Sequence, residues 1–543
     1  FVTSNTPDMV DIGMRQTWTN QSQPLDVEIH YVLRRGATGI YTYALLDHPA
    51  SYPAGGYGEW RMVWKTPADA FERLYVDELR NREMPTSFDY ANASATSIAE
   101  VVHLNTGVLA GQDEGKYCYS TEYAKTPVWG HASDIRKTGV WLVLGSQEYL
   151  NDGPFKQDLG PAAGILHVHF GRNHYNGSSL SVPAGESWRK LYGPFLLYCN
   201  TEAAGADACW KDAQTQAAAE RAAWPYDWLV GNADYPTAAQ RATVSGSIAL
   251  NDPLKPDLDA TGAWVGLAAP EPGGNFQFES KRYQHWAKSG EGGTFAIPHV
   301  RPGTYTLYCV VRGEAGEYES STPVTVAAGQ ALDLGPLEWT VPRSGAWMAW
   351  EIGLPDRDST EFRHGKDYFT PFVYNRFDDE FPNPLSYDVS SSVAATDWNY
   401  AQTGYSDGVS PIVPWPWQIH FRLPALPAAG TARLHLSFAG GNYTRMQVDV
   451  NGSNPVGGSG FFYVPNDRGN ALVRQSSHGK YGYRTLEIPI SMLKVGANTI
   501  TITQTKVDDM SMHCMYDYVG LEMPALPGGN PPDGDGDGLT DLW

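Results

Sequence analysis

The sequence is poor in cysteine and in basic residues, and it contains no long apolar run. None of its five cysteines forms a CxxC pair, which argues against a zinc ribbon or a thioredoxin-type site. Its 39 lysines and arginines face 60 aspartates and glutamates, and the net charge of −21 argues against nucleic-acid binding. No apolar run approaches the ~20 residues that span a bilayer, so we expect no membrane partner.

Turn-forming and aromatic residues, by contrast, are abundant. The chain contains 56 glycines and 38 prolines, and 12% of its residues are aromatic. This composition is typical of a folded, turn-rich β protein rather than of a disordered chain. At roughly 100–200 residues per domain, the 543 residues correspond to three or four domains.

Residues 1–238 are predicted to form a β-sandwich with one helix. The runs Asp26–Leu33, Val140–Leu144 and Ile165–Phe170 are apolar, or alternate apolar with polar residues, as strands do. Asp212–Ala223 is rich in alanine and predicts a helix that ends before a Trp-Pro pair.

Two smaller β domains are expected to follow. Residues 239–342 have the length, about 100 residues, and the regular turns of an immunoglobulin-like or fibronectin III-like domain. Their predicted strands are Arg241–Ala249, Gly293–Ile297, Thr304–Val311 and Ser321–Val326.

Residues 343–525 have the alternating pattern of an antiparallel jelly roll, the common form of a carbohydrate-binding module. Their predicted strands are Ala432–Phe438, Met446–Val450, Thr485–Ile490 and Thr499–Thr503.

Residues 526–543 are predicted to be a Pro- and Gly-rich linker that ends in a truncated calcium-binding-like repeat. The carboxylates of Asp533, Asp535 and Asp537 alternate with glycine there, and Asp541 follows three residues after the last of these glycines. Calcium takes about six to eight hard oxygens from a flexible loop. The pattern is similar to the start of an extracellular thrombospondin type 3 or dockerin-like repeat, although the terminal glutamate of an EF-hand is missing. A solvated acidic tail is the alternative.

Several features favour a secreted protein. Besides the tail, Cys199 and Cys209 bracket a small loop rich in alanine and glycine. A disulfide between them would fit an oxidising compartment, and two unpaired thiols are the alternative. The chain opens at Phe1 without a methionine or a leader pattern, which indicates a processed or trimmed start.

Two clusters of basic and aromatic residues stand out in the first region. Lys116 enters a β-like run, and His167 and His169 share one face of a predicted strand, because side chains alternate along a strand. His174 follows after a turn. A zinc or other metal site, hydrogen-bonded structural histidines and a polar substrate cleft are all open here, although no HExxH motif is present.

These clusters and other segments, in the same order, resemble polysaccharide lyase family 4, the rhamnogalacturonan lyases. The first-region segments are His30–Ala44, Gly58–Arg61, Arg80–Pro85, the Lys116 run, Phe155–Leu159 and Asn173–Gly177. The later ones are Tyr283–Trp286, Ile297–Tyr305 and Trp350–Gly353. The resemblance implies a galactose mutarotase-like catalytic sandwich, a fibronectin III-like domain and a carbohydrate-binding-like jelly roll. It also implies that the chain lacks the first strands of its catalytic sandwich, which in the family precede the segment matching Asp11–Trp18.

The resemblance carries over to individual residues. The family's catalytic lysine matches Lys116, its catalytic histidine matches His174, and its substrate-binding arginine matches Arg61. Two positions that can carry tyrosines beside the sugar are occupied here by His167 and His169. Further candidates for substrate contact are Arg80, Arg82 and Tyr175. For the two arginines, a position as solvated residues at the end of a strand is an equally good interpretation.

This set of residues suits β-elimination at a uronate. Arg61 can donate two hydrogen bonds to the uronate carboxylate, and it can stabilise the enolate that forms when the proton on C5 of the uronate is removed. Lys116 would be the general base, and His174 would assist it or protonate the departing oxygen. The expected partner is a uronic-acid polysaccharide, such as pectic rhamnogalacturonan I. No cofactor is required for the reaction, a structural Ca²⁺ is a candidate ion, and we expect a monomer.

Other functions remain open on the sequence alone. One is a lyase for another rhamnose–uronate polymer, such as ulvan, and another is a carbohydrate-binding protein without catalysis. A glycoside hydrolase would need paired carboxylates, and no recognisable pair is present. In the third region, the candidates for stacking on sugar rings are Trp398, Tyr400, Trp415 and Trp417, with core packing as the more ordinary interpretation of each.

Overall fold

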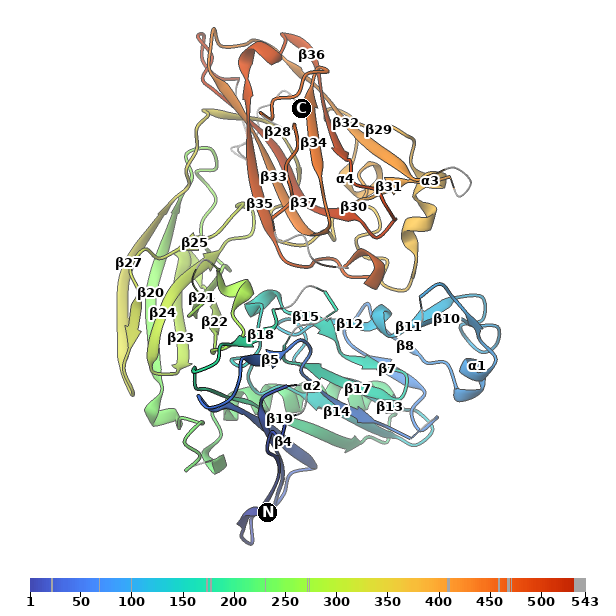
Figure 1. The fold of residues 1–543 in the computed structure, drawn as a ribbon, viewed down its shortest axis with the longest axis vertical. Helices are drawn as coiled ribbons and strands as arrows, with labels where there is room; N and C mark the ends of the chain where they lie inside the picture. Colours follow the sequence, from blue (N-terminus) through green and yellow to red (C-terminus); the bar gives the residue numbers. More distant parts are fainter. Residues whose placement is uncertain are drawn as a thin grey trace.

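The chain forms three β-rich regions that follow one another in sequence (Figure 1). The computed structural model describes residues 1–531 except 21–22, 68, 99, 172–173, 176–177, 230, 271, 273, 408–410, 458–459, 466–468 and 470. The carboxylates of the tail lie outside the described residues, so calcium binding there stays a prediction for Asp533, Asp535, Asp537 and Asp541. Among the described helices, none is both long and apolar enough to cross a membrane.

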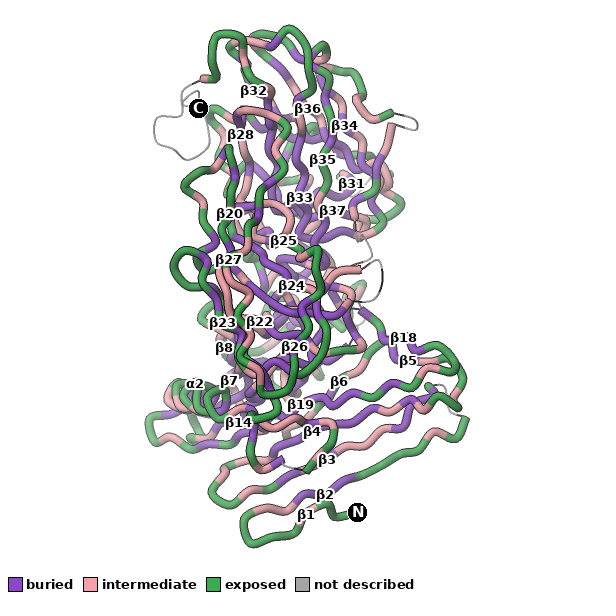
Figure 2. The backbone as a smooth tube through the Cα atoms, turned by 90° about the vertical axis from the view of Figure 1, so that its left-hand side faces the viewer, coloured by how far each residue is buried: buried purple, intermediate pink, exposed green. Residues whose placement is uncertain are grey.

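The first region is built on a nine-stranded antiparallel sheet with the order β1-β2-β3-β4-β19-β14-β13-β7-β8. The strands are β1 (Val2–Asn5), β2 (Met9–Gln16), β3 (Asp26–Arg34), β4 (Gly39–His48), β19 (Trp188–Thr201), β14 (Thr138–Val143), β13 (Val128–Ser133), β7 (Arg73–Tyr75) and β8 (Asn81–Glu83). Helix α2 (Ala206–Ala223) covers one face through Cys209, Trp210 and Ala213. A second core, which includes Trp129 and Phe170, covers the other face. The predicted sandwich is therefore present and α2 is its long helix, although a second, short helix also forms at Ser87–Ala91. Strands β1 and β2 are largely exposed at the edge of the sheet (Figure 2).

Small sheets lie over this second core and carry the side chains of interest. One has the order β16-β17-β6 and another pairs β12 with β15. Their bounds are β16 (Pro161–Ala162), β17 (Ile165–His169), β6 (Arg61–Lys65), β12 (Ser120–Glu122) and β15 (Gln157–Leu159). Beside them lie β18 (Leu180–Val182), β5 (Gly55–Tyr57), β11 (Asp113–Gly115), β10 (Val101–His103), β9 (Ser94–Ala95) and α1 (Ser87–Ala91). The predicted strand Ile165–Phe170 is β17, one residue shorter.

The second region is a small sandwich of two sheets, as its turn spacing predicts. One sheet contains β23 (Thr294–Val300), β20 (Ala242–Asn251) and β27 (Ala331–Thr340). The other contains β22 (His285–Lys288), β21 (Trp264–Ala268), β24 (Gly303–Val310), β25 (Tyr318–Glu319) and β26 (Val324–Val326). Apolar side chains of both sheets, such as Val244, Val265 and Leu307, form one buried core between them.

The third region is a larger sandwich of two five-stranded sheets. The first contains β28 (Trp347–Gly353), β37 (His513–Met523), β33 (Thr431–Asn442), β35 (Gly482–Pro489) and β30 (Ala401–Gln402). The second contains β29 (Leu385–Asp388), β32 (Val413–Leu423), β36 (Gly496–Gln504), β34 (Met446–Val450) and β31 (Gly404–Tyr405). The short helices α3 (Phe377–Glu380) and α4 (Ala394–Asp397) lie in its connections.

The aromatic residues proposed to stack on sugars belong to the core of the third region. Trp398, Trp415 and Trp417 are fully buried, and Tyr400 is 3% exposed. The three tryptophan rings pack edge-to-face or tilted on one another and on Tyr516, and the Tyr400 ring packs edge-to-face on Phe377. Core packing, the more ordinary interpretation of each, is therefore confirmed, and stacking on sugars is excluded because a sugar ring cannot reach side chains buried this deeply.

Buried polar contacts join the regions. Glu148 of the first region accepts hydrogen bonds from Arg241 (2.7 and 3.1 Å) and from Arg301 (2.7 and 3.0 Å) at the border with the second. Burial opposes ionisation of Glu148, but the two guanidinium groups hold its pKa far below the ordinary value. We call residues 474–480 of the third region the reaching segment, because Ser476 donates to Gln157 and Lys480 donates to Ser178 (2.7 Å) in the first region.

The five cysteines all lie among the described residues, and all are free. Cys209 is buried on α2, whereas Cys199 is exposed on β19. The next residue on β19, Asn200, donates to the carbonyl oxygen of Cys209 at 2.7 Å, so its side chain points toward α2. Because side chains alternate along a strand, Cys199 points away from the helix, which accounts for the absence of a disulfide.

Candidate active site

The first part of the site is a cross-strand pair at the end of two strands. Arg61 begins β6 and lies opposite His169, the last residue of β17. Side chains directly opposite in an antiparallel pair are neighbours on one face of the sheet. The Arg61 guanidinium donates to Glu59, whose Oε1 is 3.9 Å from His169 Nδ1. Arg61 is 43% exposed and His169 is buried, so the arginine is the member of this pair that an incoming ligand meets first.

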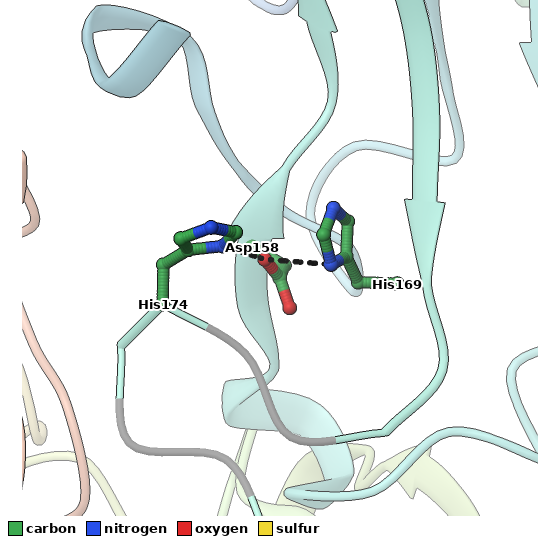
Figure 3. Close-up of side chains that lie close together, drawn as sticks. All are labelled: Asp158, His169 and His174. Carbon is green, nitrogen blue, oxygen red and sulfur yellow. Dashed lines mark ion pairs between the residues drawn. The ribbon is translucent and has the colours of Figure 1, made fainter. Parts of the chain in front are cut away.

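Asp158 on β15 is the centre of the buried part of the site. Its Oδ1 lies 3.6 Å from His169 Nδ1 and 3.8 Å from His174 Nδ1, so the two imidazoles flank one carboxylate (Figure 3). Lys156 places its Nζ 3.1 Å from the other carboxylate oxygen. Burial opposes ionisation of Asp158, but His169, Lys156 and His174 hold its pKa below the ordinary range. Asp158 is therefore a buried anion flanked by the two imidazoles.

His167 and His169 are neutral at neutral pH. Burial lowers the pKa of His169 to about 3 and that of His167 to about 4. The pKa of His167 is lowered further by the positive charges of Arg61 and Lys116. Both cations therefore disfavour a positive charge on the same imidazole.

Lys116 begins a short 3-10 helix, η1 (Lys116–Tyr119), directly after β11. Its Nζ lies 2.5 Å from Glu100 Oε1, and the hydroxyl of Tyr117 donates to the other oxygen of Glu100. The Tyr117 ring in turn lies 5.6 Å from the His174 ring, centroid to centroid. Tyr117 thus connects the lysine predicted to be catalytic with the histidine predicted to be catalytic.

The third region contributes Arg474 to this site. Arg474 ends the 3-10 helix η8 (Leu472–Arg474), donates to the Tyr117 hydroxyl and lies 3.9 Å from Glu100 Oε2. Its guanidinium carbon is 4.4 Å from the centroid of the Tyr117 ring, which is the geometry of a cation–π contact. Sequence reasoning missed Arg474, because nothing in the sequence relates it to a tyrosine 357 residues earlier.

The structure gives Arg80 and Arg82 partners within the fold. Arg80 is 2% exposed, donates to Asp77 and lies over the Tyr368 ring of the third region. Neither a substrate contact nor a solvated strand end fits such a side chain, because its charge is already paired and covered. Arg82 donates to Glu114 and to the Tyr119 hydroxyl, and it packs on Phe369.

Tyr175, the remaining candidate for substrate contact, is buried rather than exposed. It belongs to a small apolar cluster with Tyr117, Val101 and Leu159, next to η1. Direct stacking of a sugar on Tyr175 is therefore disfavoured. Tyr175 instead packs in the cluster that holds Tyr117 in place.

Asp158, His169 and His174 are also the residues that could hold a metal ion. Their ligand atoms lie within 4.8 Å of one another, which is compatible with a small ion between them. Lys156, however, already supplies a positive charge at 3.1 Å from Asp158. A divalent ion would have to share the carboxylate with that ammonium group, so the geometry favours an orienting carboxylate over a metal centre.

Three family models match the chain and cover most of it between them. They are the rhamnogalacturonate lyase family over residues 1–109, polysaccharide lyase family 4 domain II over residues 260–334, and domain III of that family over residues 348–521. The models for domains II and III are described as fibronectin III-like and carbohydrate-binding-module-like, and with the observed sheets they confirm the predicted fold class.

Named relatives match along nearly the whole chain. A rhamnogalacturonate lyase of Dickeya dadantii is 28% identical, and the match covers 96% of this chain and 82% of the relative. A probable rhamnogalacturonate lyase B of Aspergillus niger is 24% identical over 92% of this chain and 74% of the relative. Rhamnogalacturonate lyase B of Emericella nidulans is 24% identical over 94% of this chain and 84% of the relative.

The fold and these matches identify a polysaccharide lyase. More specifically, the chain belongs to polysaccharide lyase family 4.

The contact of Arg474 with Tyr117 predicts a role in positioning Lys116. We expect Arg474→Met to lower kcat/KM by roughly tenfold to a hundredfold, because a small displacement of a catalytic group has effects of this size. The loss should fall on kcat more than on KM, since Arg474 contacts Tyr117 and Glu100 rather than the reacting atoms. Arg484→Met, which removes another arginine that packs on a ring in the third region, is the control. Equal kinetics for the two variants would contradict this role.

Proposed function

We propose that the protein is a rhamnogalacturonan lyase that cleaves the rhamnose–galacturonate backbone of rhamnogalacturonan I by β-elimination at the galacturonate. The observation that carries the proposal is the convergence of Arg61, Lys116 and His174. Arg61 lies opposite His169, His169 and His174 flank Asp158, and the Tyr117 ring contacts both Lys116 and His174. The names of the relatives support the choice of polymer.

Arg61 neutralises the uronate carboxylate. The proton on C5 is weakly acidic, because its removal leaves a second negative charge delocalised into the carboxylate. A guanidinium group can donate two parallel hydrogen bonds to that carboxylate and is best placed when it is exposed at the mouth of the site, as Arg61 is. The stabilisation grows as the enolate forms, so it accelerates the reaction and does not merely tighten binding.

Lys116 removes the C5 proton. Its amine forms an N–H bond as the C5–H bond breaks, the electron pair forms the C4=C5 double bond, and the C4–O4 bond breaks. The departing O4 of the neighbouring sugar takes up a proton. Lys116 must leave Glu100 to reach C5, so entry of the uronate has to replace the 2.5 Å contact between them.

Two roles are open to His174, and both use its contact with Asp158. It assists the proton transfer to Lys116, or it protonates the departing O4. In either role the imidazole must present a defined nitrogen to the sugar. Asp158 Oδ1 lies 3.8 Å from Nδ1, so its negative charge favours a proton on that nitrogen, and we propose that Nε2 acts on the sugar.

The net charge of −21 does not prevent binding of a polyanion. Surface charges are screened beyond about 8–10 Å at physiological ionic strength. The uronate therefore responds mainly to the nearby Arg61 and Lys116.

The substrate is tested by digestion of rhamnogalacturonan I beside ulvan and homogalacturonan, followed by ultraviolet absorbance and product masses. We expect unsaturated oligosaccharides from rhamnogalacturonan I alone. Unsaturated products from ulvan or homogalacturonan alone would overturn the polymer assignment. Saturated products would indicate hydrolysis, and binding without any product would indicate a carbohydrate-binding protein.

A further inference from the structure

A pocket lies between the first and second regions, apart from the candidate active site. Its volume of about 370 Å³ falls within the roughly 300–1,000 Å³ of small-molecule sites. Arg221 and Trp224, at the end of α2, line it together with Trp264 of β21 and with Trp286 and Lys288 of β22. We call it the interdomain pocket. The candidate active site contributes none of its described lining residues.

The side chains from β21 and β22 share one face of that pair of strands. Trp264 lies opposite Lys288, and Gly266 lies opposite Trp286. Directly opposite residues of an antiparallel pair are on the same face, and so are alternate residues along each strand. The intervening residue Val265 is fully buried in the core of the second region. Trp264, Trp286 and Lys288 are therefore directed away from that core.

The two tryptophans are held in place but are not covered. A Cβ atom at Gly266 would lie 2.1 Å from Cδ2 of Trp286, so only glycine lets that ring approach β21 so closely. Nε1 of Trp286 donates to Gln284 at 3.0 Å, and Lys288 Nζ lies 4.3 Å from the centroid of the Trp264 ring. Both tryptophans are partly exposed, unlike the buried tryptophans of the third region. They offer the aromatic surface on which the apolar C–H face of a sugar ring can pack.

The pocket contains two cations that the protein does not balance. Arg221 is in the last turn of α2, and Lys288 donates to the carbonyl oxygen of Gly262 at 2.8 Å. No carboxylate among the described residues pairs with either cation. Glu148 is the one carboxylate among the described lining residues, and it already accepts hydrogen bonds from two arginines. The pocket is therefore locally positive in a chain whose net charge is −21.

Both cations favour an anionic ligand. Burial lowers the pKa of Arg221 and that of Lys288, and the positive charge of Lys125 lowers the pKa of Lys288 further. A carboxylate in the pocket would offset these effects, because a nearby negative charge favours the protonated form of each group.

A smaller hollow of about 170 Å³ continues from the interdomain pocket. Pro154, Trp264 and Lys288 line both. Other cations in the smaller hollow are already paired, as Arg312 is with Asp356 at 3.1 Å. A uronate therefore fits the interdomain pocket, and a neutral sugar next to it in a chain fits the smaller hollow.

We propose that the interdomain pocket is a second, non-catalytic binding site for a polysaccharide that contains uronates. The carboxylate of one uronate contacts Arg221 and Lys288, and the sugar ring packs on Trp264 or Trp286. The choice of ligand rests on the proposed function, because the same polymer is the substrate of the active site. Binding at a second site keeps the polymer at a high effective concentration between successive cleavages.

The test observes the pocket directly in the full chain. The protein is labelled with fluorotryptophan and carries Lys116→Ala, so that the ligand is not consumed, and its ¹⁹F NMR spectrum is recorded during titration with oligosaccharides of rhamnogalacturonan I. The resonances of Trp264 and Trp286 are assigned through Trp264→Phe and Trp286→Phe. We expect both resonances to shift saturably, and oligosaccharides whose carboxyl groups have been reduced to alcohols to bind about tenfold more weakly or worse.

Variants of the two cations decide whether the charges bind the ligand. Arg221→Met/Lys288→Met should raise the Kd obtained from these shifts by about tenfold or more. With Lys116 present, the same double variant should keep wild-type kcat/KM on short oligosaccharides, because it leaves the active site intact. Lys211→Met/Lys494→Met removes the same charge from exposed positions elsewhere and should leave the Kd unchanged. Tm serves as the check of folding.

The outcomes separate this inference from the proposed function. Absence of shifts at both tryptophans, or equal Kd values for the two double variants, overturns the second site. Unsaturated products from rhamnogalacturonan I without such shifts overturn the second site alone. Saturable shifts without any unsaturated product support the second site and overturn the lyase reaction on that polymer.

Discussion

Replacement of Lys116 by alanine is expected to lower the rate of unsaturated product formation by about 10²–10⁴-fold, the usual contribution of a general base. The variant keeps the rest of the site, because Lys116 contacts the partly exposed Glu100 and the side of Tyr117 rather than the core. Loss of one partly exposed ion pair costs about 0–1 kcal/mol. The measurement is the initial rate of ultraviolet absorbance on rhamnogalacturonan I, with Tm as a check of folding.

A second variant distinguishes a base from a fixed positive charge. Lys116→Arg keeps the charge, but a guanidinium group does not release its proton in proteins. If Lys116 is the base, the arginine variant should be about as inactive as the alanine variant. Lys211→Ala, on the exposed side of α2, should retain wild-type activity. Substantial activity of Lys116→Arg would contradict the role of base and leave an electrostatic role.

Replacement of Arg61 by alanine is expected to lower kcat/KM by about 10²–10³-fold, the range found when one donor to a developing anion is removed. Both kcat and KM should change, because the carboxylate is charged in the substrate and bears more charge in the transition state. Arg61→Lys should fall between the alanine variant and the wild type, since lysine supplies charge without the planar pair of hydrogen bonds.

The control for Arg61 is Arg35→Ala. Arg35 is also an exposed arginine of the first region with a carboxylate partner, Asp8, at 3.2 Å, but it lies in the turn after β3 of the large sheet, outside the site. Its loss should leave both the rate and Tm unchanged. A wild-type rate for Arg61→Ala, measured beside this control, would show that the uronate carboxylate is neutralised by another group.

The strands were predictable from the sequence where one face is buried and the other is solvated. The predicted strand Met446–Val450 coincides with β34, in which buried and partly exposed residues alternate. Predicted strands such as Ala432–Phe438 are shorter than the observed β33 (Thr431–Asn442). The end of β33 is buried on both faces, so alternation, the signal used to find it, is lost there.

Features set by distant partners could not be predicted. Helix α2 begins at Ala206, six residues before the predicted start at Asp212, because the Asp134 carboxylate accepts from the Ala206 N–H at 2.8 Å. This contact satisfies a free N–H group that a local capping residue would otherwise serve. Sequence alone likewise could not show that Trp417 is in the core, because an aromatic residue on an alternating strand suits either face.

Only part of the candidate site could be predicted, because some of its residues lie in recognisable motifs and others are brought in by the fold. Arg61, Lys116 and His174 lie in short motifs that resemble those of a family, so they were found without the structure. Asp158 and Glu100 are single carboxylates among 60 acidic residues, and only the fold shows that they contact the motif residues. Lys156 and Asp158 did offer a signal, since alternate residues share one face of a strand.

The reaching segment limits how the three regions can be separated or exchanged. Its side chains are buried against the first region, where Ser476, His478 and Lys480 meet Gln157, Glu122 and Ser178. A truncated enzyme without the third region would expose these groups and lose the support of Tyr117. Chimeras that graft a different carbohydrate-binding domain onto this catalytic sandwich therefore need to retain residues 474–480 in place, as part of the catalytic unit rather than of the module.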